Sequence, residues 1–153
     1  MMIVIDLDTP TNAEVQALLL RHFELMRASS PEESCHVMEP GTLLERDVAL
    51  FAAREGGIVM GVGAMAIIEP GHGELKSMHT AAEARGRGVA RAVLKALLDH
   101  ARGIELTRVS LETGSADMFA PARALYAAHG FTECPPFGDY VVDPLSVFMT
   151  RQL

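Results

Sequence analysis

Apolar and polar residues follow two different periods within the first thirty positions. Residues 3–7 place an apolar side chain at every second position, which predicts a short first strand. Thr11 and Glu14 have the spacing of a capping box, so we expect a helix to begin there. Helical spacing then continues to about Ala28. The apolar face of this helix consists of Val15, Leu18, Leu19, Phe23 and Met26.

The middle of the chain predicts three strands joined by tight turns. Glu55-Gly56-Gly57 has the composition of a hairpin turn, and Pro70-Gly71-His72-Gly73 has that of a second turn. Gly61 and Gly63 lie inside the second strand, where glycine indicates a bulge or a close approach by another segment. The three predicted strands are Val48–Arg54, Ile58–Ile68 and Glu74–Thr80.

The last third of the chain predicts two helices between strands. The first begins at Val89 and ends with Arg102, because Gly103 follows directly. The second has Pro121 in its first turn and ends at Gly130. The predicted strands here are Arg108–Thr113, Phe131–Cys134 and Ser146–Arg151.

The order of these elements predicts the fold class. Residues 29–41 show no period, and a brief helical turn is expected at 42–46. The order is β-α-β-β-β-α-β-α-β-β, which predicts an α/β (α+β) fold around a largely antiparallel sheet with a parallel middle. With 153 residues, the chain is expected to form one domain over 1–153.

The turn before the helix at Val89 is both basic and rich in glycine. Residues 85–95 contain four basic side chains and no acidic one: Arg85, Arg87, Arg91 and Lys95. The first N–H groups of a helix lack partners within the helix, and the helix dipole adds positive potential. Gly86 and Gly88 would let a phosphate approach the backbone. This turn is therefore predicted to hold an anion.

Composition narrows the class of partner. Thirteen basic and twenty acidic residues give a net charge of −7, which argues against nucleic acid or an anionic membrane as the main partner. Cys35 and Cys134 are too few for a disulfide framework, so we expect reduced thiols and a cytoplasmic protein. We expect no signal peptide, no transmembrane helix and, from the spacing of histidines and cysteines, no metal site.

Two nucleotide-binding motifs fit the glycine turn poorly. Gly86-x-Gly88 matches half of a dinucleotide fingerprint, but Arg91 occupies the third glycine position. No acidic residue lies about twenty positions further on to hold a ribose, since Asp99 comes too early. A Walker loop is excluded because no Gly-Lys-Ser/Thr follows.

Two motifs resemble those of the GCN5-related N-acetyltransferases. Arg85-x-x-Gly88-x-Ala90, after the strand ELKSMHT, is similar to the Arg/Gln-x-x-Gly-x-Gly/Ala motif of that family. The strand VSLET is followed by PARALYAAHGF, where family members have a helix with Leu-Tyr and a trailing Gly-Phe. LETGS and the tail CPPFGDYVVDPLSVFMTR are similar to the YsnE-like branch of bacterial acetyltransferases. The resemblance implies a mixed, mostly antiparallel sheet of about six to seven strands flanked by about three to four helices.

The resemblance also implies acetyl-CoA as the co-substrate. Backbone N–H groups from Arg85 to Ala90 would cradle the pyrophosphate, and the strand edge at Met78–Thr80 would hydrogen-bond the pantetheine arm. An N–H near His79 would polarise the thioester carbonyl. Many members offer an asparagine after the fifth strand, for which Ser115 is a substitute candidate. The predicted co-substrate residues are Met78, His79, Thr80, Arg85, Gly86, Arg87, Gly88, Val89, Ala90, Arg91 and Ser115.

Three residues are candidates for the chemistry. Tyr126 matches the family's tyrosine that protonates the departing thiolate, and its alternative is an amphipathic core tyrosine. Glu112 is the first candidate for the base that takes the amine proton, and Glu74 is the second. For each carboxylate, a solvated or ion-paired strand residue is an equally good interpretation. Asp139 and Tyr140 either line the acceptor pocket or shape a turn.

The sequence therefore predicts an acetyl-CoA-dependent N-acetyltransferase that transfers the acetyl group directly to a primary amine in a ternary complex. A covalent acyl-enzyme is not expected, because no activated nucleophile stands out. The alternative is a non-catalytic acyl-CoA-binding sensor. The acceptor, a small molecule or a peptide amine, stays open, as does a homodimer.

Overall fold

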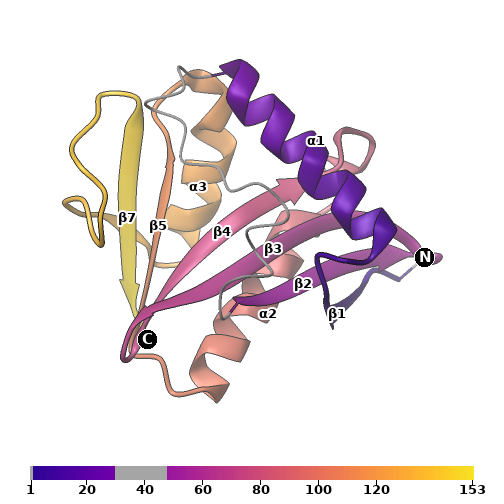
Figure 1. Ribbon diagram of the computed structural model, residues 1–153, viewed down its shortest axis with the longest axis horizontal. Helices are drawn as coiled ribbons and strands as arrows, with labels where there is room; N and C mark the ends of the chain where they lie inside the picture. The colour runs from indigo at the N-terminus through magenta and orange to yellow at the C-terminus, as the bar shows by residue number, and fades with distance from the viewer. Residues whose placement is uncertain (1, 30–47) are drawn as a thin grey trace.

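The computed structural model describes residues 2–29 and 48–153, in which seven strands form one sheet (Figure 1). The helical turn predicted at 42–46 lies outside these residues, as does Cys35. The strands are β1 (Val4–Asp8), β2 (Val48–Glu55), β3 (Ile58–Glu69), β4 (His72–Thr80), β5 (Arg108–Gly114), β6 (Thr132–Glu133) and β7 (Ser146–Gln152). The helices are α1 (Ala13–Ser29), α2 (Val89–Gly103) and α3 (Ala120–Ala128), with short 3₁₀ turns η3 (Ala82–Ala84) and η4 (Asp117–Phe119).

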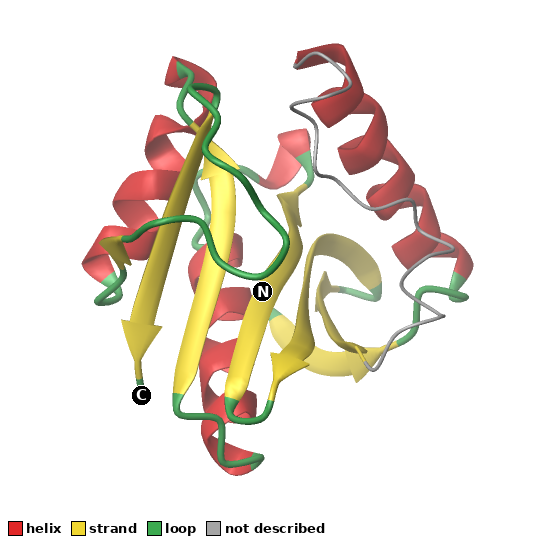
Figure 2. Ribbon diagram, turned by 60° about the vertical axis from the view of Figure 1, so that its left-hand side comes forward, coloured by secondary structure: helices red, strands yellow, loops and turns green. Residues whose placement is uncertain are grey.

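The predicted fold class is confirmed. The strands are ordered β1-β2-β3-β4-β5-β7-β6, and all neighbours are antiparallel except β4 and β5, which are parallel. Figure 1 shows α1 in front of the sheet, and Figure 2 shows α2 and α3 behind the strands. The sheet thus separates two layers of helix, and the connection between β6 and β7 crosses its front face (Figure 2).

The core forms mainly between α2 and the sheet. Apolar residues recur every three or four positions along α2, so one face of this helix is buried while charged residues remain outside. Each fully buried valine or leucine contributes about 1.5–3 kcal/mol of transfer free energy. The buried residues of α2 are Val89, Val93, Leu94, Leu97, Leu98 and Ala101.

Both predicted roles of the β3 glycines are present. A Cβ atom on Gly61 would lie 2.5 Å from Val89 Cγ1, and one on Gly63 would lie 2.7 Å from Val93 Cγ1. Because Gly61 and Gly63 have no side chains, α2 can approach β3 closely at these two positions. Gly63 also lies opposite a register shift between β3 and β4, which is a β-bulge.

The predicted capping box at the start of α1 is wrong. The residue that caps α1 is Asn12, whose Oδ1 accepts hydrogen bonds from the backbone N–H groups of Glu14 (3.1 Å) and Val15 (3.2 Å). Thr11 instead shares a hydrogen bond with the hydroxyl of Thr9 (2.9 Å). Asparagine caps helices at least as well as threonine. The capping-box spacing of Thr11 and Glu14 is a coincidence.

The second predicted turn is shorter than expected. His72 belongs to β4, where it pairs with Glu69 of β3 and with Arg108 of β5. The turn itself is made by Pro70 and Gly71, and Gly71 has a φ of +76°, which a glycine adopts without strain. Strand β6 is likewise shorter than the predicted 131–134.

The close packing of α2 on β3 makes a first prediction. Replacing Gly63 with alanine places a Cβ within 3 Å of Met78 Sδ, Val93 Cγ1 and Leu97 Cδ1. We expect this overpacking to cost about 1–3 kcal/mol and to lower the thermal unfolding midpoint by about 3–10 °C. Gly103→Ala is the matched control, because nothing lies within 4 Å of its Cβ position. Equal midpoints for the two variants would contradict close packing at Gly63.

Candidate active site

Strands β4 and β5 pair over only part of their length. Their parallel ladder runs from His72 and Arg108 to Leu75 and Leu111 and then stops, although β4 continues to Thr80 and β5 to Gly114. Figure 1 shows the two strands leaning apart toward their carboxyl ends. The edge of β4 that faces β5 therefore has backbone groups with no partner strand beyond Leu75.

A bulge in β4 lies directly beside this gap. Val62 pairs with His79 and Ala64 with Lys76, so Gly63 stands opposite two residues, Ser77 and Met78. Ser77 has a φ of +56°, which is uncommon for a residue other than glycine. Such a bulge turns the backbone away from regular strand geometry and redirects its N–H groups.

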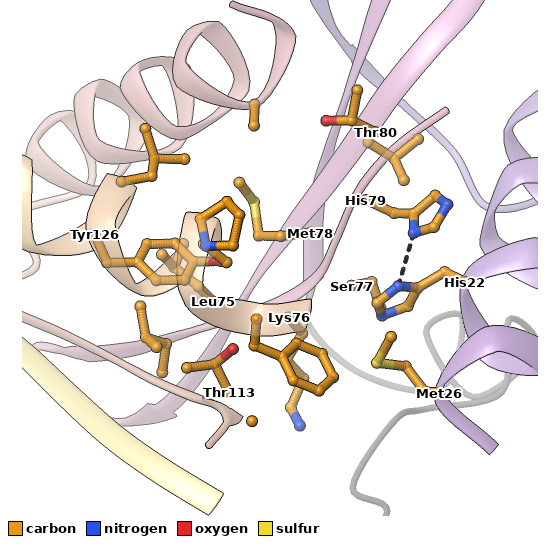
Figure 3. Close-up of a pocket in the computed structure, with 18 of the residues that line it drawn as sticks. His22, Met26, Leu75, Lys76, Ser77, Met78, His79, Thr80, Thr113 and Tyr126 are labelled. Carbon is orange, nitrogen blue, oxygen red and sulfur yellow. Dashed lines mark hydrogen bonds between the residues drawn. The ribbon is translucent and has the colours of Figure 1, made fainter. Parts of the chain in front are cut away.

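A cavity of about 760 Å³ occupies the gap. Residues of β4 from Glu74 to Thr80 and of β5 from Leu111 to Gly114 form its two sides. Helix α1, helix α3, the loop before α2 and the connection between β6 and β7 also contribute (Figure 3). Its volume is in the range of small-molecule sites.

The glycine turn closes one end of this cavity. Gly86 and Gly88 have φ values of +77° and +80°, so glycine is required for conformation at both positions. Gly88 is the N-cap of α2 and no side chain caps it, so the first N–H groups of the helix are available to a ligand. An open turn of backbone N–H groups with adjacent arginines fits a diphosphate.

Most of the predicted co-substrate residues meet at the cavity, but Arg87 and Ser115 do not. The Arg87 guanidinium forms an ion pair with Glu55 and is absent from the cavity lining. The Ser115 hydroxyl donates a hydrogen bond to the carbonyl of Pro144 (2.8 Å). The residues that line the cavity are Met78, His79, Thr80, Arg85, Gly86, Gly88, Val89, Ala90 and Arg91.

Tyr126 approaches the cavity from α3, behind the sheet. Its side chain is only 6% exposed, its ring packs edge-on against Phe131, and it lies near Leu75 and Met78 in Figure 3. Burial raises the pKa of the Tyr126 phenol well above its usual value, so the group is fully protonated at neutral pH. Among the described residues, its hydroxyl makes no hydrogen bond. Tyr126 therefore carries its proton in an apolar setting.

Glu112 lines the cavity from β5. Glu74 and Ser110 are register partners, so Glu112 and Lys76, each two residues further along its strand, project from the same face of the sheet. Burial raises the pKa of the Glu112 carboxyl to about 7, although the nearby Ser146 hydroxyl and, to a smaller extent, the Lys76 ammonium lower it. A carboxyl group with this pKa exchanges protons readily near neutral pH.

Glu74 is engaged in a closed polar cluster. Its Oε2 accepts a 2.5 Å hydrogen bond from the Tyr140 hydroxyl and lies 3.2 Å from Lys76 Nζ. Lys76 Nζ also donates to the Tyr140 hydroxyl (3.3 Å). Tyr140 belongs to the connection between β6 and β7 and lines the cavity. The cluster fastens this connection to β4.

His22 is a cavity residue that the sequence analysis missed. It lies on α1, and its Nδ1 is 3.1 Å from the Nδ1 of His79 (Figure 3). Burial lowers the pKa of both histidines to about 4, so both are neutral at physiological pH. A signal for His22 existed, because it continues the apolar stripe of α1 three residues after Leu19.

Other kinds of site receive no support from the described residues. Across 2–29 and 48–153, no three His, Cys, Asp or Glu side chains gather as metal ligands. Within the same residues, no helix has the length and apolar character needed to cross a bilayer.

Comparisons with known proteins agree with this geometry. The sequence profile of the acetyltransferase (GNAT) family matches residues 13–131. The Bacillus subtilis (strain 168) protein YsnE, named as an N-acetyltransferase, is 41% identical over 149 residues, which cover 97% of this chain and 99% of YsnE. A Klebsiella pneumoniae structure whose name assigns it to the acyl-CoA N-acyltransferases superposes with a TM-score of 0.81 at 31% identity, covering 99% of this chain and 98% of the other.

A more distant structure has a ligand bound. An acetyltransferase of the GNAT family from Elizabethkingia anophelis, solved with acetyl-CoA, has a TM-score of 0.73 at 18% identity over 99% of this chain and 98% of its own. At this identity the likeness concerns the fold alone. From its profile match and its similarity to YsnE, the chain belongs to the acetyltransferase (GNAT) family and is an N-acetyltransferase.

Proposed function

We propose that this enzyme transfers the acetyl group of acetyl-CoA directly to a primary amine within a ternary complex. The observation that carries the proposal is the gap between β4 and β5, which has a glycine turn at one end and Tyr126 and Glu112 on its two sides.

The residues present fit acetyl-CoA as a co-substrate. The backbone turn from Arg85 to Ala90 would hold the pyrophosphate, with the exposed side chains of Arg85 and Arg91 adding positive charge. The unpaired edge of β4 at Met78–Thr80 would hydrogen-bond the pantetheine amides in the manner of an added strand. The acetyl end would then reach the bulge, where redirected N–H groups would polarise the carbonyl.

Two side chains would handle the protons of the transfer. The acceptor nitrogen forms a bond to the acetyl carbon, and the bond from that carbon to sulfur breaks. Glu112 would accept the proton that the nitrogen loses, and the Tyr126 hydroxyl would donate a proton to the departing thiolate. Glu74 is less suited to be the base, because its Oε2 already accepts bonds from Tyr140 and Lys76.

The two sides of the sheet would then have separate tasks. Tyr126 comes from α3, behind the strands, whereas Glu112 shares its face with Lys76. We therefore expect the acceptor amine to enter from the front face, between α1 and the β6–β7 connection. The half-buried carboxyl of Glu112 on that face favours an acceptor that arrives as a cation, which would release one proton to solvent before its neutral nitrogen attacks and passes the next to Glu112.

The proposal is tested first by binding. Calorimetric titration should show micromolar affinity for both acetyl-CoA and desulfo-CoA, and no binding of ATP. Arg85→Ala should weaken acetyl-CoA binding by about threefold to tenfold, since it removes a cation beside the glycine turn. Arg87→Ala, whose guanidinium is paired with Glu55, should have a smaller effect. If neither CoA form binds, the proposal is wrong.

Tyr126→Phe tests the proton donor. After an acceptor is found by screening amines for thiol release, we expect turnover to fall about a hundredfold, because the thiolate loses its general acid. The dissociation constant for acetyl-CoA should stay within about twofold, since the ring is kept. Unchanged turnover would remove Tyr126 from this role.

Glu112→Gln tests the base through its pH dependence. The wild-type rate should rise as pH increases through about 7, where Glu112 loses its proton, and the variant should be slower and lack this inflection. A persistent inflection near pH 7 in Glu112→Gln would assign the base elsewhere.

The same substitution should affect stability in the opposite sense. Burial raises the pKa of Glu112 in the folded chain above its unfolded value, so the folded state binds more protons and wild-type stability falls as pH rises from about 4.5 to 7. Glu112→Gln should therefore be more stable than wild type by about 1–3 kcal/mol at pH 8, and this gain should vanish near pH 4.5. Urea unfolding at the two pH values measures the difference.

A further inference from the structure

The hydrogen bond between His22 and His79 joins two elements of the active site. His22 lies on α1 and His79 on β4, and the two rings meet edge to face with centroids 5.0 Å apart. Figure 3 shows both rings at the α1 side of the cavity, next to Ser77 and Met26. His79 is the second residue after Ser77, so this bond attaches α1 directly to the β4 bulge.

The two histidines form a hydrogen bond and carry no charge at physiological pH. A bond between two Nδ1 atoms needs one proton, so one ring donates and the other accepts. With pKa values of about 4, both rings are neutral at physiological pH. Burial is the main cause of the lowered pKa of each ring, and Arg21 and Arg85 lower that of His79 further, while Glu83 opposes them. Such weak bases are poor acceptors for the proton of an amine. The two histidines are therefore better suited to fixing the position of the backbone through their hydrogen bond.

Other polar contacts between α1 and this region are weak. Arg21 of α1 pairs with Glu83 of η3 at 3.2 Å, but their side chains are 48% and 66% exposed, so water and salt screen the pair. Apolar contacts from Leu25 and Met26 fill space without fixing a direction. The partly buried histidine bond is therefore the specific link between α1 and the bulge among the described residues.

We propose that His22 is a positioning residue, which holds His79 and the β4 bulge so that the backbone N–H groups of the bulge point at the carbonyl of a bound thioester. The inference rests on the proposed function, because it concerns how that site polarises its co-substrate. It explains why a residue with a φ of +56°, Ser77, persists in a strand: the bond on one side and β3 on the other hold the backbone in place.

The test measures carbonyl polarisation and does not require the acceptor. Isotope-edited infrared spectra of [1-¹³C]acetyl-CoA should show the carbonyl stretch of the wild-type complex at lower wavenumber than in free acetyl-CoA. In His22→Phe, which keeps the ring but removes the hydrogen bond, this displacement should fall by at least half. Calorimetric affinity for acetyl-CoA should stay within about threefold, and turnover should fall about tenfold.

Matched variants separate positioning from general damage. His22→Gln keeps a hydrogen-bonding group and should retain most of the displacement. His100→Phe, a histidine of α2 that packs on Phe51 outside the cavity, should retain all of it. Thermal unfolding establishes that each variant is folded. If His22→Phe does not fold, His79→Phe removes the same bond from the strand side and should give the same reduction.

The outcomes distinguish this inference from the proposed function. If wild type does not bind acetyl-CoA, the proposed function itself fails. If acetyl-CoA binds but its carbonyl is unshifted, or is shifted equally in wild type and His22→Phe, the positioning role is wrong while the function stands. A shift that is lost in His22→Phe and kept in His22→Gln and His100→Phe supports it.

Discussion

The parting of β4 and β5 is the constraint on which the rest of this structure depends. Within a sheet, each strand satisfies the backbone groups of its neighbour, and the ladder between these two strands ends after Leu75 and Leu111. Beyond that point the edge of β4 needs another partner, which water or an extended ligand supplies. Every group in the proposed mechanism lies around this unfilled position: the glycine turn at its end, Tyr126 behind it and Glu112 in front. The candidate active site thus occupies the place that a continued pairing of β4 with β5 would fill.

The groups around the gap differ in how readily they carry charge. His22 and His79 are neutral at physiological pH, Tyr126 keeps its proton, and Glu74 forms an ion pair with Lys76. Glu112 is the carboxyl of the set whose pKa is raised to the neutral range. Burial is the largest cause of the pKa shifts of the two histidines, Tyr126 and Glu112. Because it acts in opposite directions on acids and bases, one cavity holds two neutral histidines and one carboxyl that titrates near neutral pH.

Local sequence signals predicted the helices and strands. They did not predict side-chain partners that are far apart in the sequence. Helix α2 and its glycine turn follow from spacing and residue type, and the order of elements and the parallel middle of the sheet were also predicted. The partner of Arg87 was not, because Glu55 is 32 residues away and only the fold brings it near. His22 and His79 are 57 residues apart in the sequence, and the hydrophobic pattern of neither segment indicates that they form a hydrogen bond. At the start of α1 the error was local: Thr11 had the motif spacing, but Asn12 makes the capping bonds.

The placement of the aromatic residues has a consequence for how this enzyme can be observed. The chain contains no tryptophan and two tyrosines, and both tyrosines line the cavity. Phenylalanine emits only weakly, so the intrinsic ultraviolet fluorescence comes mainly from two residues of the cavity lining, Tyr126 behind the sheet and Tyr140 in front of it. A ligand or an amine that enters the cavity alters the surroundings of both tyrosines. The native chain thus carries its own optical probe, with no label to perturb it.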